Sequence, residues 1–385
     1  MSSKKPVLRS VVKPKRHQKT SSKTQNQFRV KLKSFTAKFS QLALWKRCFI
    51  VLIALVFALF TLQYSVYLWY FNSEKGKPYQ LGVTYVPTYA RSLGLDPVKT
   101  YDAILHDLGV RHLRIVSYWN EIEPTQGTFN FDELDWQFRE ANKVGAKINL
   151  AIGLRQPRWP ECHAPNWVDI TQPRAAWQPQ LETFMTKVIM RYKDNPALET
   201  YQLENEYFNT VFGGCHDFSR TRLIEELALV KSLDANTPVI ISRSNNSPTI
   251  MLRNPKTDIH AFTLYRIVYD QTLTKRYYLY PFPTWHYGAV AGWQKLIGGQ
   301  ESMIHELQAE PWPPSNSGGV QGITVEEQSK TMDAQKLRDN VEFAKKTGMH
   351  TIDLWGAEYW YYRMVIEKDP SVWNEARDIF HNPDK

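Results

Sequence analysis

Two patterns of hydrophobic and polar residues divide the chain. From Cys48 to Phe71 the sequence runs for 24 residues without a charged side chain. This length exceeds the roughly 20 apolar residues that a helix needs to cross a bilayer. From Tyr79 onward, short apolar stretches alternate with longer amphipathic ones, and Gly, Pro or Asn marks the turns between them. The first pattern predicts a membrane-spanning helix, and the second predicts an α/β domain.

The alternating region contains eight stretches that fit buried strands. We expect them at residues 81–86, 110–116, 147–152, 201–206, 238–242, 258–265, 306–309 and 351–355. Helices are expected between them at residues 97–108, 132–144, 178–192, 220–234 and 324–347. Eight strands that alternate with helices favour a closed (β/α)8 barrel over an open parallel sheet. The pattern is weakest in the sixth strand and in the stretch 268–300.

The charge of the chain is concentrated at its N-terminus. The formal net charge is +10, yet residues 1–47 hold 14 Lys and Arg and no Asp or Glu. The rest therefore has 34 basic and 38 acidic side chains, which gives no electrostatic argument for nucleic acid binding. Residues 1–47 are too polar to form a core, so we expect a disordered tail. It either has no specific partner or is attracted to anionic lipid head groups.

The surroundings of the apolar stretch predict its topology. Tyr64, Tyr67, Trp69 and Tyr70 crowd its C-terminal end, as an aromatic belt does at a membrane interface. A cleaved signal peptide is disfavoured because the leader is too long and no small-residue cleavage site follows. We therefore predict a basic cytoplasmic tail (1–47), a single-pass transmembrane helix (48–71), a linker (72–78) and an extracytoplasmic barrel domain (79–385).

Two glutamates stand where a barrel keeps its chemistry. Asn205 and Glu206 end the predicted fourth strand, and Glu310 follows the predicted seventh. Catalytic groups of (β/α)8 enzymes lie at the C-terminal ends of the strands. Of two carboxyl groups on facing strands, one can protonate the glycosidic oxygen while the other attacks the anomeric carbon. At a separation of about 5 Å this gives retention. Glu306 has the same strand parity as Glu310 and is expected to be an interior ion-paired residue or to lie at the bottom of the barrel.

Other polar and aromatic side chains follow the predicted strands. An aromatic ring can cover the apolar face of a sugar, and 13% of the chain is aromatic. The alternative for each tryptophan is ordinary packing, and Arg114 could simply neutralise a buried carboxylate. The candidate substrate-binding residues are Asn205, Arg114, Trp119, Trp159, Tyr265, Trp312, Trp355 and Glu358.

These features together resemble the clan-A retaining glycoside hydrolases, which include family-5 cellulases and family-42 β-galactosidases. The resemblance rests on Asn205-Glu206, Glu310 and Trp355 in this order, and on the segment 119–131, WNEIEPTQGTFNF. It covers roughly residues 79–365. It implies that Glu206 is the acid/base, that Asn205 binds the sugar 2-hydroxyl, and that Glu310 is the nucleophile, helped by Tyr265 and Arg114. Tyr207 departs from family 5, where Pro usually follows the Asn-Glu pair, and no strand-three His is evident near residues 153–155.

The cysteines carry a separate prediction. Cys162 and Cys215 follow the third and fourth strands, in neighbouring loops on the side predicted to be outside the cell. Disulfides persist there, so we expect the two to pair, the alternative being two free thiols. No Cys or His spacing suggests zinc, and no metal or cofactor is expected.

The sequence favours a membrane-anchored retaining O-glycosidase acting on an extracytoplasmic polysaccharide or oligosaccharide. A transglycosylase of cell-wall or exopolysaccharide assembly would use the same two glutamates. A barrel that binds glycan without cleaving it has no need of both. A metal-dependent sugar isomerase is least favoured, because the strand ends are poor in Asp and His.

Overall fold

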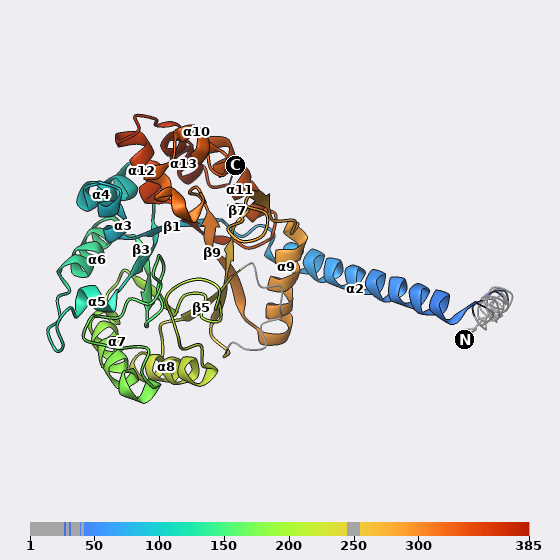
Figure 1. Ribbon diagram of the computed structural model, residues 1–385, viewed down its shortest axis with the longest axis horizontal. Coiled ribbons are helices and arrows are strands. Elements are labelled where there is room, and N and C mark those ends of the chain that lie inside the picture. The colour runs from blue at the N-terminus through green and yellow to red at the C-terminus, as the bar shows by residue number, and fades with distance from the viewer. Residues whose placement is uncertain (1–26, 28–30, 32–38, 40–41, 245–254, 385) are drawn as a thin grey trace, which may run out of the picture. The chain divides into compact units, whose positions relative to one another are not determined.

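The computed structural model describes residues 42–244 and 255–384, together with residues 27, 31 and 39 (Figure 1). The chain forms two compact units, Met1–Leu62 and Gln63–Lys385. The predicted disordered tail lies almost wholly outside the described residues. Helix α2, Leu44–Glu74, begins in the first unit and ends in the second. Within the described part of the chain it is the one helix whose length and apolar composition allow it to cross a bilayer.

The second unit is built on a closed barrel of eight parallel strands. Each strand pairs with its neighbours in chain order, and the last pairs with the first, which confirms the predicted (β/α)8 architecture. Helices surround this barrel (Figure 1). The strands are β1 Gln80–Tyr85, β2 His112–Val116, β3 Lys147–Ile152, β4 Leu198–Leu203, β5 Val239–Arg243, β6 Ile259–Leu264, β9 Glu301–Gln308 and β10 Thr351–Trp355.

The helices bury one apolar face against the strands. In α4, for example, Tyr101, Ile104 and Leu105 are buried, and the side chain of Asp96 caps the helix by accepting from the Val98 and Lys99 amides. The helices of this unit are α3 Pro87–Ser92, α4 Pro97–His106, α5 Trp119–Ile122, α6 Asp132–Val144, α7 Gln178–Tyr192, α8 Arg220–Leu233, α9 Thr284–Trp293, α10 Val325–Ser329, α11 Ala334–Lys345, α12 Ala357–Val365 and α13 Ser371–His381.

Four regions differ from the sequence prediction. The fourth strand, β4, covers Leu198–Leu203 instead of residues 201–206, so Asn205 and Glu206 lie beyond its end. The seventh barrel strand, β9, begins at Glu301 rather than at residue 306 and ends at Gln308. The helix expected over residues 324–347 is split into α10 and α11, because Asp333 caps a new helix by accepting from the Lys336 amide. The stretch 268–300 contains the antiparallel strands β7 Ile267–Tyr269 and β8 Tyr277–Leu279, helix α9, and a π-turn, η2 Gln294–Gly298.

Candidate active site

Glu206 lies just beyond the C-terminal end of β4 and is 9% exposed. Its Oε1 accepts a hydrogen bond from the Thr263 hydroxyl at 2.5 Å, and its Oε2 accepts one from the Asn209 amide at 2.8 Å. Burial raises the pKa of Glu206, and the nearby charge of Glu306 raises it further. Glu206 is therefore suited to carry a proton and to give it to a substrate oxygen.

Glu306 lies inside the barrel on β9 and is 3% exposed. Arg114 of β2 donates to its Oε1 at 2.7 Å, and the Tyr265 hydroxyl donates to its Oε2 at 2.8 Å. Burial beside Glu306 raises the pKa of Tyr265, so its hydroxyl keeps the proton that it donates. The expected partners of Glu310, Arg114 and Tyr265, thus bind Glu306 instead.

Glu310 follows β9 by two residues and forms a different set of contacts. Arg158 donates to both of its oxygens, at 2.5 and 3.0 Å, and the Trp355 indole N–H donates to its Oε1 at 2.7 Å. The Arg158 guanidinium lies between two rings, 3.5 Å from the centroid of Tyr89 and 4.1 Å from that of Trp355. Glu310 is therefore one half of an ion pair that covers the face of Trp355.

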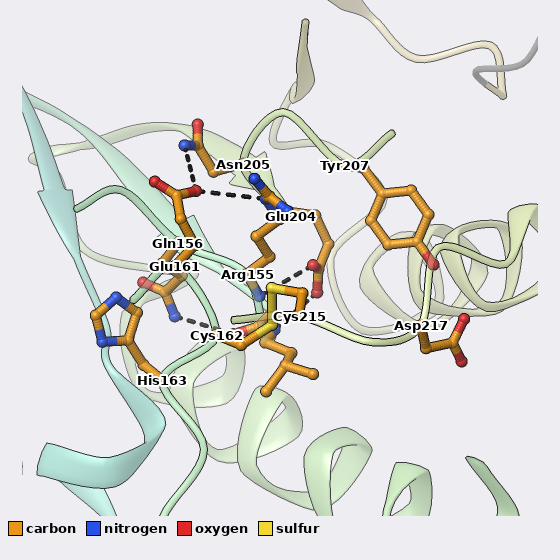
Figure 2. Close-up of a disulfide and its surroundings, with 12 residues drawn as sticks. Arg155, Gln156, Glu161, Cys162, His163, Glu204, Asn205, Tyr207, Cys215 and Asp217 are labelled. Carbon is orange, nitrogen blue, oxygen red and sulfur yellow. Dashed lines mark hydrogen bonds and ion pairs between the residues drawn. A yellow bond between two sulfur atoms is a disulfide. The ribbon is translucent and has the colours of Figure 1, made fainter. Parts of the chain in front are cut away.

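Asn205 connects the two sides of the site. Its Oδ1 accepts from Arg114 at 2.8 Å, and its Nδ2 donates to Glu161 at 3.0 Å. Figure 2 shows Glu161 between Asn205 and Arg155, whose Nε is 3.3 Å from the Glu161 carboxyl. Burial raises the pKa of Glu161 to about 8, although Arg155 opposes this shift. The site thus contains a further carboxyl group that is protonated near neutral pH.

A disulfide between Cys162 and Cys215 joins the loops that follow β3 and β4, which confirms the predicted pairing (Figure 2). Cys162 is the residue after Glu161, so the bridge lies next to the network around Asn205. Behind it, Glu204 follows the last residue of β4 with a φ of 56° and turns away from the barrel interior. Its carboxyl accepts from the Leu154 and Arg155 amides and pairs with Arg222 of α8.

The predicted aromatic residues fall into three groups. Trp355 lies in the site, and Trp312 packs edge-on against Tyr265 with their centroids 4.9 Å apart. Trp159 is 68% exposed on the loop after β3. Trp119 differs from the prediction that it binds substrate, because it is fully buried, stacks on Phe184 of α7 and donates to Glu123 at 2.7 Å. It packs α5 against the barrel.

Glu358 is also enclosed by the protein. Its Oε1 accepts from the Val86 amide at 2.6 Å, and its Oε2 is 3.5 Å from Arg158. Burial raises its pKa to about 7, although Arg158 opposes this shift. Glu358 is thus linked to Glu310 by Arg158, which contacts both carboxyl groups.

Sequence reasoning missed Arg158 and Glu161. It expected Glu306 to be an interior ion-paired residue or to lie at the bottom of the barrel, and the pair with Arg114 confirms the first alternative, but it gave Glu306 no role in the site. The parity of Glu306 with Glu310 was visible, but strand ends predicted from hydrophobicity were shifted along β9. Arg158 and Glu161 lie in an irregular loop, and both have positive φ angles, 79° and 70°. Periodicity carries no information about such a loop, so the sequence held no signal for either role.

No family model matches the chain. Its fold is similar to that of several solved glycoside hydrolases. A β-galactosidase from Marinomonas ef1 matches with a TM-score of 0.51 and 14% identity, over 79% of this chain and 59% of that enzyme. A GH5_18 protein from Streptomyces cattleya in complex with GlcNAc matches with a TM-score of 0.50 and 13% identity, over 72% of this chain and 70% of that one.

A further GH5_18 protein, from Bifidobacterium longum subsp. longum in complex with Manβ1-4GlcNAc, matches with a TM-score of 0.51 and 12% identity. The match covers 72% of this chain and 68% of that protein. The chain therefore shares the (β/α)8 barrel fold of these solved proteins, and it spans less than two thirds of the length of the Marinomonas β-galactosidase.

Proposed function

We propose that this protein is a retaining glycoside hydrolase in which Glu206 is the acid/base and Glu306 is the nucleophile. The proposal rests on the observation that two buried carboxyl groups of the site have contrasting hydrogen-bond donors. Glu206 has a raised pKa, and within the described residues its side-chain donors are Thr263 and Asn209, which are neutral. Glu306 accepts from a guanidinium and a tyrosine hydroxyl. Carboxyl groups held in such contrasting surroundings are the usual basis of an acid and a nucleophile in one site.

The proposed reaction has two displacements. In the first, a Glu306 oxygen forms a bond to the anomeric carbon as the bond to the leaving oxygen breaks, and Glu206 gives its proton to that oxygen. In the second, the Glu206 carboxylate takes a proton from water, whose oxygen attacks the anomeric carbon and releases Glu306. If a sugar hydroxyl replaces the water, the same steps give transglycosylation.

Glu306 replaces Glu310, the sequence candidate, in the nucleophile role for a physical reason. The two carboxyl groups of a retaining site must lie close together. The charge of Glu306 raises the pKa of Glu206, which supports their proximity, whereas both oxygens of Glu310 are held by Arg158. We propose that Glu310, Arg158, Trp355 and Asn205 bind the sugar, with Trp159 and Trp312 contributing on the rim.

We further propose that α2 anchors the enzyme in a membrane with its basic N-terminus on the cytoplasmic side. The length and composition of the helix support an anchor. The 14 basic residues before Cys48 support the orientation. The substrate is then an extracytoplasmic polysaccharide or oligosaccharide, and the tail is available to anionic lipid.

The test of the catalytic assignment is covalent trapping. The full chain in detergent is incubated with 2-deoxy-2-fluoro glycosyl fluorides of gluco, galacto, manno and xylo configuration, and intact and peptide masses are measured. We expect one adduct, carried by the peptide with Glu306 and absent in Glu306→Gln. An adduct on Glu310 would restore the sequence assignment. Inverted anomeric products from a cleaved natural glycan would exclude the retaining mechanism.

A further inference from the structure

The last three turns of α2 belong to the barrel unit. From Gln63 onward the helix is part of the second unit, and Val66, Tyr70 and Glu74 are buried, with exposures of 6%, 1% and 3%. These residues recur at intervals of four, so one face of the helix is covered. The buried face lies against α9 and the end of α11.

Polar contacts fix this packing at both ends. The Trp293 indole N–H donates to Gln63 at 2.8 Å, and the Tyr67 hydroxyl donates to the Lys346 carbonyl at 3.0 Å. Lys295 pairs with Glu74 at 2.6 Å. The exit of α2 from the barrel unit is therefore held by specific bonds rather than by a loose linker.

Two glycines of α9 allow the helices to approach closely. A Cβ on Gly288 would lie 2.5 Å from the Tyr67 ring, and a Cβ on Gly292 would lie 2.7 Å from Val66. Both distances are shorter than any normal carbon contact. The interface between α2 and α9 requires these glycines.

The length of the free part of α2 creates a conflict with bilayer thickness. The uncharged residues before the packed segment, Cys48–Leu62, number 15. At about 1.5 Å per residue they reach about 22 Å, whereas a hydrocarbon core is about 30 Å thick. The long side chains of Lys46 and Arg47 can reach back to the head groups, which reduces the difference between helix length and bilayer thickness. The first packed turn of α2 still lies at membrane depth.

The barrel surface next to this turn is apolar. Leu296 and Ile297 follow α9 directly and are 50% and 79% exposed, and Trp293 is partly buried beside Gln63. The Trp285 ring centroid lies 6.4 Å from that of Tyr64. We call these four residues, Trp285, Trp293, Leu296 and Ile297, the α9 flank. Tryptophan and aliphatic side chains of this kind favour the interfacial layer of a bilayer.

We propose that the α9 flank inserts into the interfacial layer of the same bilayer that α2 enters. The proposal rests on the anchoring role of α2 given above and goes beyond it, because it makes the barrel itself a lipid-binding body. The partner follows from two facts. The flank continues the surface of the first packed turn of α2, which lies at membrane depth, and the adjacent Lys295 is neutralised by Glu74 and Glu301.

The test is a depth measurement on the full chain in liposomes. In a Cys48→Ser background, single cysteines at Ile297, Phe57 and Val211 are labelled with an environment-sensitive fluorophore. Phe57 reports the anchor, and Val211, 94% exposed in the loop after β4, is the control for solvent. We expect brominated lipids to quench the labels at Ile297→Cys and Phe57→Cys, and aqueous iodide to quench the label at Val211→Cys.

Each result decides one claim. If the label at Ile297→Cys is quenched by iodide as fully as that at Val211→Cys while Phe57→Cys remains protected, the flank proposal is overturned and the anchor stands. If Phe57→Cys is also reached by iodide, the anchor fails and the flank proposal fails with it. Glycosidase activity is measured in parallel as a check that each labelled protein is folded.

Discussion

The two catalytic candidates differ most in what surrounds each carboxyl oxygen. Glu206 accepts from a hydroxyl and an amide, which are neutral, and burial raises its pKa. Glu206→Gln keeps the shape of the side chain but cannot donate an acidic proton. We expect kcat to fall about 100-fold to 10,000-fold on natural glycosides. Aryl glycosides whose leaving group needs no proton should form the glycosyl-enzyme at nearly the normal rate, as measured by burst kinetics. Equal losses on both substrate types would contradict the acid role.

Glu310 should affect binding rather than bond formation. Glu310→Gln removes the closer of the two carboxylates that pair with Arg158 and leaves Glu358 at 3.5 Å, so we expect KM to rise and stability to fall by up to about 3–5 kcal/mol. Covalent trapping on Glu306 should persist in this variant. The control is the double variant Glu310→Met with Arg158→Met, which removes both charges and should recover much of the stability in a denaturant titration. Loss of trapping in a folded Glu310→Gln protein would assign Glu310 to the chemistry.

At the scale of elements, hydrophobic periodicity predicted the barrel because each strand is buried on both faces and each helix on one. It located β3, α6 and α7 at their observed bounds. It failed at β9, where the polar pair His305-Glu306 interrupts the apolar run, and at Asp333, where a local cap outweighs the helical pattern. The site residues divide in the same way between those set by local pattern and those set by other contacts. Glu206 was predictable from a strand end, whereas the role of Glu306 depends on Arg114 and Tyr265, which only the closed barrel brings to it.

The two loops above β3 and β4 act together because the disulfide joins them. The bridge closes a separation of 53 residues, which corresponds to about 4 kcal/mol of loop entropy in the unfolded chain. Replacing both Cys162 and Cys215 by Ser should lower the free energy of unfolding by that order, as measured by urea titration under non-reducing conditions. Activity should fall in addition, because Glu161 precedes Cys162 and holds Asn205. An unchanged unfolding free energy would mean that the two loops are held by other contacts.

The close contact between α2 and α9 predicts that a larger side chain at this interface loosens α2 while activity is retained. In Gly292→Val the new side chain meets Val66, so we expect the last turns of α2 to detach. Trypsin should then cut faster at Lys75, as followed by mass spectrometry, while activity on soluble glycosides is retained. Gln335→Val, an exposed substitution in α11, is the matched control for placing a β-branched residue in a helix. Equal cutting rates in the two variants would argue against tight docking.

Several buried acids of the barrel unit favour their neutral form. Burial raises the pKa of Glu161 to about 8 and those of Glu358 and Asp353 to about 7. In the unfolded chain such groups lose their protons near pH 4 to 5. Between these values the folded state binds more protons than the unfolded state, so a rise in pH favours unfolding. Stability contributed by the neutral form is complete at about pH 4.5 and is lost progressively up to about pH 8.

The full chain in detergent micelles should therefore be more stable to urea at pH 5 than at pH 8. Glu161→Gln, which resembles the protonated side chain at every pH, should reduce that difference by on the order of a few kcal/mol. Glu326→Gln, at an exposed position of α10, should leave the difference unchanged. If Glu161→Gln shows the same difference between pH 5 and pH 8 as the unaltered protein, Glu161 is ionised in the folded state. In that case Glu161 would be an anion that pairs with Arg155 and accepts from the Asn205 amide.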